Sequence, residues 1–345
     1  MSGKAEKIPR YAFRMAFLAA VLIAAAAGSV FLGRYAIAPR ELLLLLFDRS
    51  AFYEADPAGA AAAYQVFFFI RLPRLAAAML VGAALSLAGV SYQGMFRNPM
   101  VSPDILGAST GAGFGAAIAI LLGGSYAVIS GSAFCFGLLA VAAAYIISRM
   151  SRRTTPTLAM VLAGMIISSL FQAGTSFIKL VADTQSQLPA ITYWLMGSLS
   201  SIKQEDVQFI VIPIGVGAIP LFLLRWRMNL LTAGEEEAQS MGINTTLLRL
   251  IVVISATLLT AASVAVSGMI GWVGLVIPHF CRMLFGYDYR RLIPAAAMFG
   301  AAYLLIVDDI ARLITAGELP LGILTAFVGA PLFLYLLLTG GGGHD

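Results

Sequence analysis

Long apolar runs separated by short polar segments constrain this chain more than any other feature. Stretches such as Phe13 to Leu32 and Ile251 to Val266 are apolar on every face, whereas a helix on the surface of a soluble protein keeps one polar face. An α-helix needs about 20 apolar residues to cross the hydrocarbon core of a bilayer. The charged residues, only 11% of the 345, gather between these runs. The pattern predicts an all-α, polytopic membrane protein and excludes a soluble domain with large buried helices.

The apolar runs predict about ten transmembrane helices in a single membrane domain over residues 1–345. The run from Tyr11 is too long for the apolar region of a signal peptide, so we interpret it as an uncleaved first helix. Pro39 to Gly59 is expected to be a long loop, and Leu188 to Val207 to contain a half-helix on the outer surface. The expected helices lie near residues 12–33, 66–90, 105–123, 126–148, 157–180, 207–225, 247–266, 268–285, 292–314 and 320–338.

The positions of Lys and Arg predict the orientation, because cytoplasmic loops carry an excess of these residues. Most of the 22 basic residues lie inside if residues 1–11 and the tail 339–345 are cytoplasmic, which also makes 226–246 a cytoplasmic loop. Arg71, Arg74 and Arg312 then remain outside and require another role. The net charge of +5 does not indicate nucleic-acid binding, since the basic residues form no stripe with interleaved aromatics.

Two adjacent carboxylates interrupt an apolar run at Asp308 and Asp309. Ionisable groups inside a membrane are costly and point to function, so a proton-coupled secondary transporter is one hypothesis. Arg312 follows at i+4 and i+3, which allows either carboxylate to pair with it on one helix face. We favour the local ion pair over a proton relay.

The sequence predicts a protein that is not an enzyme and has no cofactor of its own. It contains no GxxxxGK[ST] phosphate loop, so energy comes from a partner or a gradient. The segment GASTGAGFG lies in an apolar run, where the spacing of Gly107, Gly111 and Gly115 indicates close helix packing. His279 and His344 are too few to build a metal site.

The inner segment LTAGEEEAQSMGI combines three acidic residues with a short helical stretch that ends at Gly242. Acidic residues at a helix start stabilise the helix dipole. An amphipathic segment of this length also suits docking against another protein, and spacing alone leaves both interpretations open.

Several segments together resemble the FecCD family, the permeases of type II ATP-binding-cassette (ABC) importers for iron siderophores, heme and vitamin B12. They occur in the family's order and cover the chain from Arg71 onward: RLPRLAAAMLVGAALSLAGVSYQGMFRNPMVSPDILGASTGAG, LAGMIISSLFQAG, WLMGSLSS, EEEAQSMGI, GMIGWVGLVIPHFCR and ELPLGILTAFVGAPLFLYLL. The resemblance implies a type II ABC importer permease fold in the prokaryotic cytoplasmic (inner) membrane. It also implies a homodimer, two cytoplasmic ATPases that bind ATP and Mg, and a periplasmic or lipid-anchored substrate-binding protein.

The same resemblance implies roles for individual residues. Docking to the binding protein would use Arg71, Arg74 and Arg312. Coupling to the ATPase would use Glu235, Glu236, Glu237, Ala238, Met241 and Gly242. Gates along the pathway would use Asn98, Met100 and Thr157.

We therefore expect alternating access without covalent chemistry, with no catalytic residue in this chain. The expected substrate is an iron complex, either a siderophore chelate or heme. Cobalamin and an oxyanion such as molybdate are the alternatives within the same family.

Overall fold

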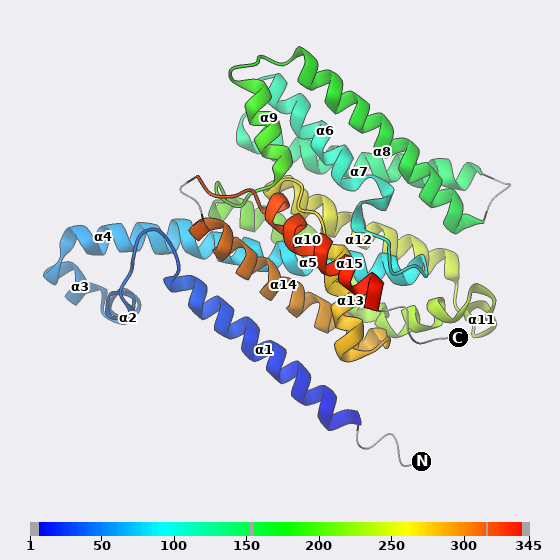
Figure 1. The fold of residues 1–345 in the computed structure, drawn as a ribbon, viewed down its shortest axis with the longest axis horizontal. Coiled ribbons are helices and arrows are strands. Elements are labelled where there is room, and N and C mark those ends of the chain that lie inside the picture. Colours follow the sequence, from blue (N-terminus) through cyan, green and yellow to red (C-terminus); the bar gives the residue numbers. More distant parts are fainter. Residues whose placement is uncertain (1–6, 152–154, 315–316, 340–345) are drawn as a thin grey trace.

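The computed structural model describes residues 7–151, 155–314 and 317–339, and all regular elements in these ranges are helices (Figure 1). Within them, seven helical segments are long and apolar enough to cross a membrane: residues 10–31, 57–95, 126–150, 156–181, 204–233, 245–267 and 289–314. Shorter apolar helices cover Ala108–Leu121, Val273–Phe285 and Leu321–Tyr335. These segments coincide with the expected apolar runs. The prediction of an all-α, polytopic membrane protein is confirmed.

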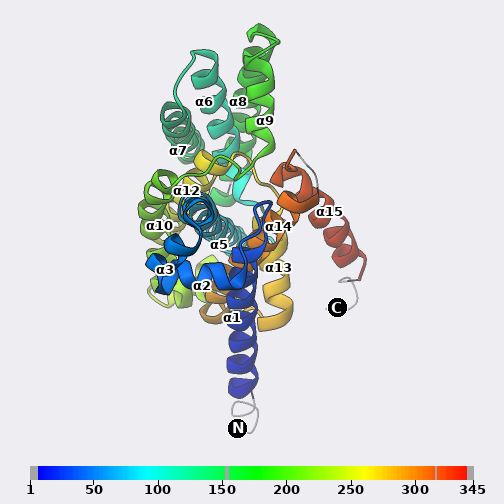
Figure 2. The same cartoon turned by 90° about the vertical axis from the view of Figure 1, so that its left-hand side faces the viewer.

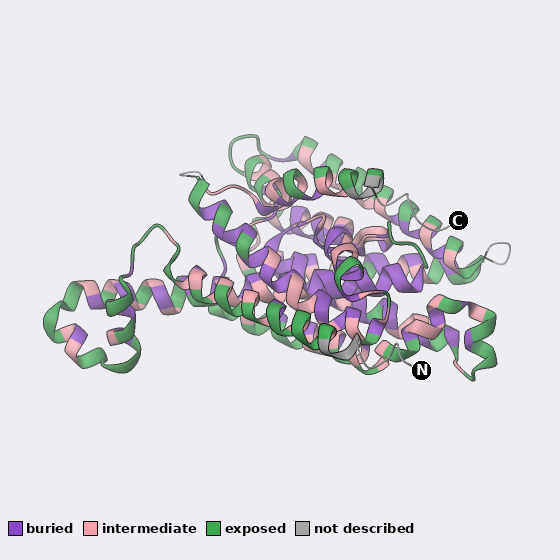
Figure 3. Cartoon of the chain, turned by 60° about the horizontal axis from the view of Figure 1, so that its bottom comes forward, coloured by how far each residue is buried: buried purple, intermediate pink, exposed green. Residues whose placement is uncertain are grey.

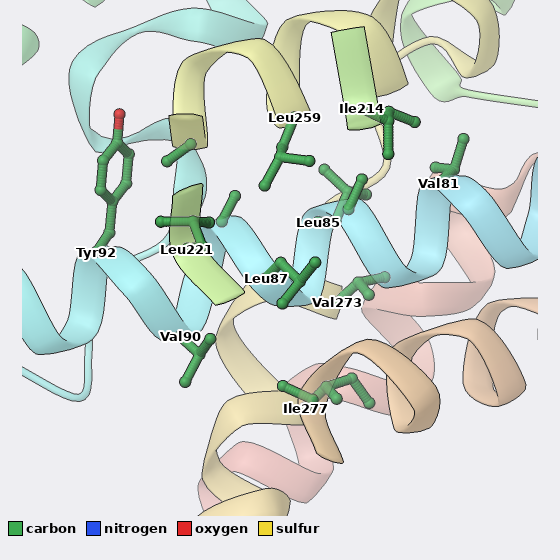
Figure 4. Close-up of a cluster of buried hydrophobic side chains, with 14 of the residues drawn as sticks. Val81, Leu85, Leu87, Val90, Tyr92, Ile214, Leu221, Leu259, Val273 and Ile277 are labelled. Carbon is green, nitrogen blue, oxygen red and sulfur yellow. The ribbon is translucent and has the colours of Figure 1, made fainter. Parts of the chain in front are cut away.

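Helix α5 (Leu72–Met95) is the centre of the fold. All residues from Ala84 to Met95 are buried. Its neighbours are α10 (Gln204–Ala233), α12 (Thr245–Ser267), α13 (Val273–Phe285) and α14 (Tyr289–Ile314). Figure 4 shows Leu85, Leu87 and Val90 of α5 among side chains of these helices, including Leu221, Leu259 and Ile277.

Glycines allow α5 to approach α13 and α14 closely. A Cβ added at Gly89 would overlap the carbonyl oxygen of Gly274, and one added at Gly82 would overlap that of Gly300. Lipid tails are as apolar as leucine, so van der Waals packing at small residues is a main force that joins helices in a bilayer. The core therefore depends on backbone contacts that larger residues would prevent.

A second group of helices packs beside this core, and α12 joins the two groups. This second group contains α6 (Ala108–Leu121), α7 (Tyr126–Met150), α8 (Pro156–Val181) and α9 (Gln187–Met196). The predicted glycine packing is confirmed, since a Cβ at Gly111 or Gly115 would lie 2.6 Å from a carbonyl oxygen of α7. Gly107 instead precedes α6 with a φ of 87°. Helix α9, ten residues long, is the expected half-helix.

The expected long loop over residues 39–59 was wrong. The chain there forms α2 (Pro39–Phe47), α3 (Arg49–Ala55) and α4 (Pro57–Gln65), and α4 continues through the π-helical turn η1 (Val66–Arg71) into α5. Asp48 and Asp56 cap α3 and α4 by accepting hydrogen bonds from Ala51 N and Gly59 N. These short helices bury their own apolar cluster: Ile37, Leu42, Leu45, Phe52, Ala60, Ala63 and Phe67.

Two helix boundaries also differ from expectation. Helix α13 begins at Val273 rather than at residue 268, because Gly268 and Trp272 have φ values of 66° and 70°, which a right-handed helix does not accommodate. Helix α10 continues to Ala233, inside the segment expected to be a loop, and is followed by α11 (Glu235–Ser240). The charged residues near the end of α10 therefore lie within the helix and do not mark its end.

The molecule has two distinct ends, which we call the α2–α4 end and the α11 end (Figure 1). Helix α1 (Lys7–Phe31) begins at the α11 end, where α15 (Leu321–Thr339) finishes. Figure 2 shows α1 and α15 at the periphery of the bundle. In Figure 3, buried residues concentrate in the middle of the bundle, while α1 and α2–α4 carry many exposed ones.

Candidate functional site

A buried ion pair joins α5 to α14 near the α2–α4 end. Arg74 Nε donates to Asp308 Oδ2 at 2.9 Å, and Arg74 Nη2 donates to Asp308 Oδ1 at 2.9 Å. Arg74 is 6% exposed and Asp308 is 0% exposed. Both charges are thus removed from solvent and depend on each other for compensation.

Arg312 extends this pair along α14. Its Nε lies 3.3 Å from Asp308 Oδ2, and its Nη2 donates to Asp309 Oδ1. Ser29 of α1 donates to Asp309 Oδ1 at 2.7 Å and accepts from Arg312 Nη2 at 3.0 Å. The predicted local ion pair of Asp308 and Asp309 with Arg312 is confirmed. We call Arg74, Asp308, Asp309, Arg312, Ser29 and Glu318 the arginine network.

Glu318, in the segment that leads into α15, is the member of the arginine network that sequence reasoning missed. Arg74 Nη1 donates to Glu318 Oε2 at 3.0 Å and to Oε1 at 3.2 Å. The Glu318 side chain is 22% exposed, more than Arg74 or Asp308. Its backbone φ of 48° is unusual for a residue with a side chain. The network thus ties α1, α5 and α14 to the start of α15.

Arg71 lies near the network but pairs with no carboxylate among the described residues. Its Nη1 donates to Val30 O at 2.6 Å and its Nη2 donates to Tyr35 O. Arg71, Arg74 and Arg312 are all less than 10% exposed. Their guanidinium groups are therefore engaged within this chain, and their predicted docking role stays a prediction.

At the opposite end, Glu235 anchors α11 to α12. Arg249 Nη1 donates to Glu235 Oε1 at 2.9 Å, and Nη2 donates to Oε2 at 2.8 Å. Thr245 adds a hydrogen bond to Glu235 Oε1 at 3.2 Å. The Arg249 hydrogen bonds lower the pKa of Glu235 below its ordinary value. A charged Glu235 therefore holds the segment in place at neutral pH.

The predicted coupling residues separate into buried and exposed ones. Ala238 is fully buried, and its carbonyl accepts from Ile243 N at 3.0 Å, so it supports the segment from within. Glu236, Glu237, Met241 and Gly242 are exposed, and Met241 is 62% exposed. We call these four residues the α11 face. The α11 face therefore presents both an apolar group, the Met241 side chain, and charged groups, the carboxylates of Glu236 and Glu237.

The predicted gate residues lie in two separate places near the α11 end. Asn98 Oδ1 accepts from Met100 N at 2.9 Å, which shapes the turn after α5 and leaves Met100 51% exposed. Gln93, a residue that sequence reasoning missed, supports this turn: its Nε2 donates to Val101 O at 3.1 Å and to Leu275 O of α13 at 3.3 Å. Thr157 lies in the first turn of α8 and is partly buried.

Comparison with known proteins identifies the family of this chain. A family model described as the FecCD transport family matches residues 19–339. The chain belongs to the FecCD transport family. This FecCD permease is therefore an ABC importer permease, a multi-pass transport subunit that is not itself catalytic, as the sequence resemblance indicated.

Named relatives and a solved structure agree with the family. The molybdate import system permease MolB of Haemophilus influenzae is 39% identical over 340 residues, 97% of this chain and 98% of MolB. A probable iron chelatin transport system permease of Helicobacter pylori is 43% identical over 268 residues, 78% of this chain and 81% of that protein. A structure described as an inward-facing metal-chelate type ABC transporter has a TM-score of 0.83 at 39% identity, covering 93% of this chain and 97% of that one.

Proposed function

We propose that this FecCD permease is the translocation subunit of an ABC importer that moves an iron complex, a siderophore chelate or heme, delivered by a substrate-binding protein. Two copies of the chain would enclose the pathway, and two ATPase subunits would bind ATP and Mg. The main support for this proposal is the α11 face. Its exposed carboxylates and Met241 lie on a segment that the Glu235–Arg249 pair anchors, which suits contact with a partner protein. The chain itself would contribute neither a catalytic residue nor a cofactor.

The proposed topology has ten membrane-crossing helices with both termini in the cytoplasm of a prokaryotic cell. Arg97 and Arg149 lie at the ends of α5 and α7, and Arg290 lies at the start of α14. These helix ends share the α11 end of the molecule (Figure 1). Cytoplasmic ends of membrane helices carry this excess of positive charge. The α2–α4 end would then face the binding protein.

Docking of the binding protein is proposed at the arginine network and Arg71. Acidic residues of the binding protein would replace Glu318 on Arg74, because Glu318 is the more accessible of the two carboxylates that Arg74 holds. Complementary charges orient such encounters and fix their register. Loss of the Arg74–Glu318 contact would free the start of α15. The docking of the binding protein would in this way change the position of a membrane helix.

Coupling is proposed to run in the opposite direction, from the ATPases to the gates. ATP-driven closure of the ATPases would move the α11 face, and with it α12 through the Glu235–Arg249 pair. Asn98, Met100 and Thr157 would open or close the cytoplasmic side of the pathway. The connection from Gln93 to Leu275 would join the Asn98 turn to α13.

An oxyanion is the second candidate substrate. The MolB alignment covers 97% of this chain, whereas the iron chelatin permease alignment covers 78%. Cobalamin is a further alternative in the family. Proton-coupled secondary transport has little support, since Asp308 and Asp309 are both engaged with arginines in buried pairs.

Co-purification with the co-encoded ATPase tests the coupling assignment. The variant Glu236→Lys/Glu237→Lys reverses the charge of the α11 face and should reduce ATPase retention at least about tenfold, since misplaced like charges cost several kcal/mol. The control Glu54→Lys/Glu205→Lys makes the same charge change at exposed positions of α3 and the start of α10. Equal ATPase retention by both double variants would contradict the assignment.

A further inference from the structure

A basic cavity of about 460 Å³ lies between the first turns of α1 and the connection from α13 to α14. Three guanidinium groups line it, from Arg10 and Arg14 of α1 and from Arg291 of α14. None of the roles proposed above uses this cavity. The start of α1, which contributes to the cavity, lies at the α11 end of the molecule (Figure 1).

Two of the arginines are held in position by their own chain. Arg14 Nη1 donates to Leu284 O, the carbonyl of a residue near the end of α13. The guanidinium of Arg291 lies 4.9 Å from the centre of the Tyr11 ring, within the range of a cation–π interaction. Each guanidinium has five N–H donors, so most of these donors stay free to bind an anion in the cavity.

The one carboxylate of the cavity does not neutralise these arginines. Asp288 Oδ1 accepts from Asn229 Nδ2 at 2.7 Å and from Arg290 N at 3.0 Å, which places the carboxylate at the start of α14. No salt bridge joins Asp288 to an arginine among the described residues. The cavity therefore keeps a surplus of positive charge.

Apolar groups beside the cavity continue toward the membrane interior. Phe17 follows Arg10 and Arg14 on one face of α1, since residues at i, i+4 and i+7 align on a helix, and it is 64% exposed. Leu284 and Met283, which line the cavity, are 43% and 63% exposed. Tyr287 is 79% exposed at the same level, where aromatic rings lie at the headgroup layer. A ligand with an anionic head and an apolar tail matches this surface.

We propose that this cavity binds the phosphate headgroup of an anionic phospholipid, with Arg10, Arg14 and Arg291 as its ligands. The membrane-spanning segment of α1 begins at Arg10, which puts the cavity at the depth of the headgroups. Basic pockets between membrane helices are the kind of site that holds anionic headgroups. The bound lipid would add a further link between the start of α1 and the connection from α13 to α14.

Native mass spectrometry of the full-length protein in neutral detergent tests the proposal with a titration of phosphatidylglycerol and, separately, phosphatidylcholine of the same acyl chains. Wild type should retain phosphatidylglycerol preferentially. Arg14→Gln/Arg291→Gln should weaken this binding about 25-fold, from about 1 kcal/mol per basic residue. The control Arg149→Gln/Arg290→Gln removes the same charge from exposed positions outside the cavity and should bind as wild type does.

Four results would overturn the proposal. One is equal retention of the two lipids by wild type, and another is equal weakening by both double variants. The third is displacement of phosphatidylglycerol by inorganic phosphate at similar concentration, which would identify a site for the free anion. If Arg14→Gln/Arg291→Gln keeps the lipid but loses the ATPase, the cavity is a protein contact and not a lipid site.

Discussion

Arg74 of α5 and Asp308 of α14 face each other with two hydrogen bonds of 2.9 Å, although 234 positions separate them in the sequence. Both residues also have a second partner, Glu318 for Arg74 and Arg312 for Asp308. The four charges therefore form a continuous chain in which Arg74, Asp308 and Arg312 are buried and Glu318 is partly exposed. The same arrangement fixes two membrane helices to each other and positions the start of α15.

Removal of one member of this pair should destabilise the protein strongly. Arg74→Gln removes the bidentate partner of Asp308, and breaking a buried ion pair costs about 3–5 kcal/mol. Denaturant unfolding in detergent micelles should show a loss of this size. The double variant Arg74→Gln/Asp308→Asn should recover part of it, because the fully buried carboxylate is no longer charged and Arg312 keeps Asp309 as its partner. Equal stability of Arg74→Gln and wild type would contradict this account of the network.

Glycine contacts of α5 should also be sensitive to an added methyl group. Gly89→Ala places a Cβ on the carbonyl oxygen of Gly274, and overpacking of this kind costs about 1–3 kcal/mol. Gly215→Ala in α10 is the matched control, since nothing lies within 4 Å of the added Cβ. Unfolding midpoints should fall for the first variant and stay equal or rise for the second. The reverse order would show that α5 and α13 are not in backbone contact.

Acidification should loosen the segment that contains α11. The pKa of Glu235 is lowered in the folded protein, so its contribution to stability is present above its ordinary value of 4.5 and is lost as the pH falls through the lowered value. Hydrogen exchange of α11 amides, corrected for intrinsic rates, should increase as the pH falls below about 4.5. Glu235→Gln should show fast exchange already at pH 7 and little further change. A wild-type protein whose α11 protection is constant across this range would contradict the anchor role.

Glu318 should compete with the binding protein for Arg74. Glu318→Gln removes the internal competitor and should raise the affinity of the binding protein about fivefold, which corresponds to roughly 1 kcal/mol. Surface plasmon resonance with the permease in nanodiscs measures this change, and its salt dependence reports the charge pairing. Glu205→Gln, at the start of α10, is the control. Unchanged or weaker binding by Glu318→Gln would reject the proposed exchange.

The membrane spans could be predicted from sequence because their signal is local. Length and apolar composition determine each span, and the Asp308–Arg312 pairing follows from helical spacing. The helices α3 and α4 also have local signals, which are helix caps and not apolar runs. Asp48 and Asp56 are N-cap residues, and Pro57 follows at the first helical position. A search for caps within residues 39–59 identifies both helix starts.

Other features had no local signal. Arg74 pairs with Glu318 across 244 positions, and no spacing rule connects residues on different helices. Gln93 likewise reaches Leu275 of α13, 182 positions away. Gly197 and Ser198, after α9, likewise join distant segments through the backbone: Ser198 N donates to Ser267 O at 2.7 Å, and Leu321 N donates to Gly197 O at 2.8 Å. Such features arise only when the helices assemble.

Uptake into proteoliposomes tests the central claim most directly. The permease is reconstituted with its co-encoded ATPase and binding protein, with ATP enclosed, and is offered a ferric siderophore, heme, cobalamin and molybdate in parallel. We predict uptake of a ferric siderophore or heme that requires both the binding protein and ATP hydrolysis and that persists when a protonophore collapses the pH gradient. Uptake of molybdate alone would replace the iron complex as substrate and keep the importer. Uptake driven by a pH gradient without the ATPase would contradict the account.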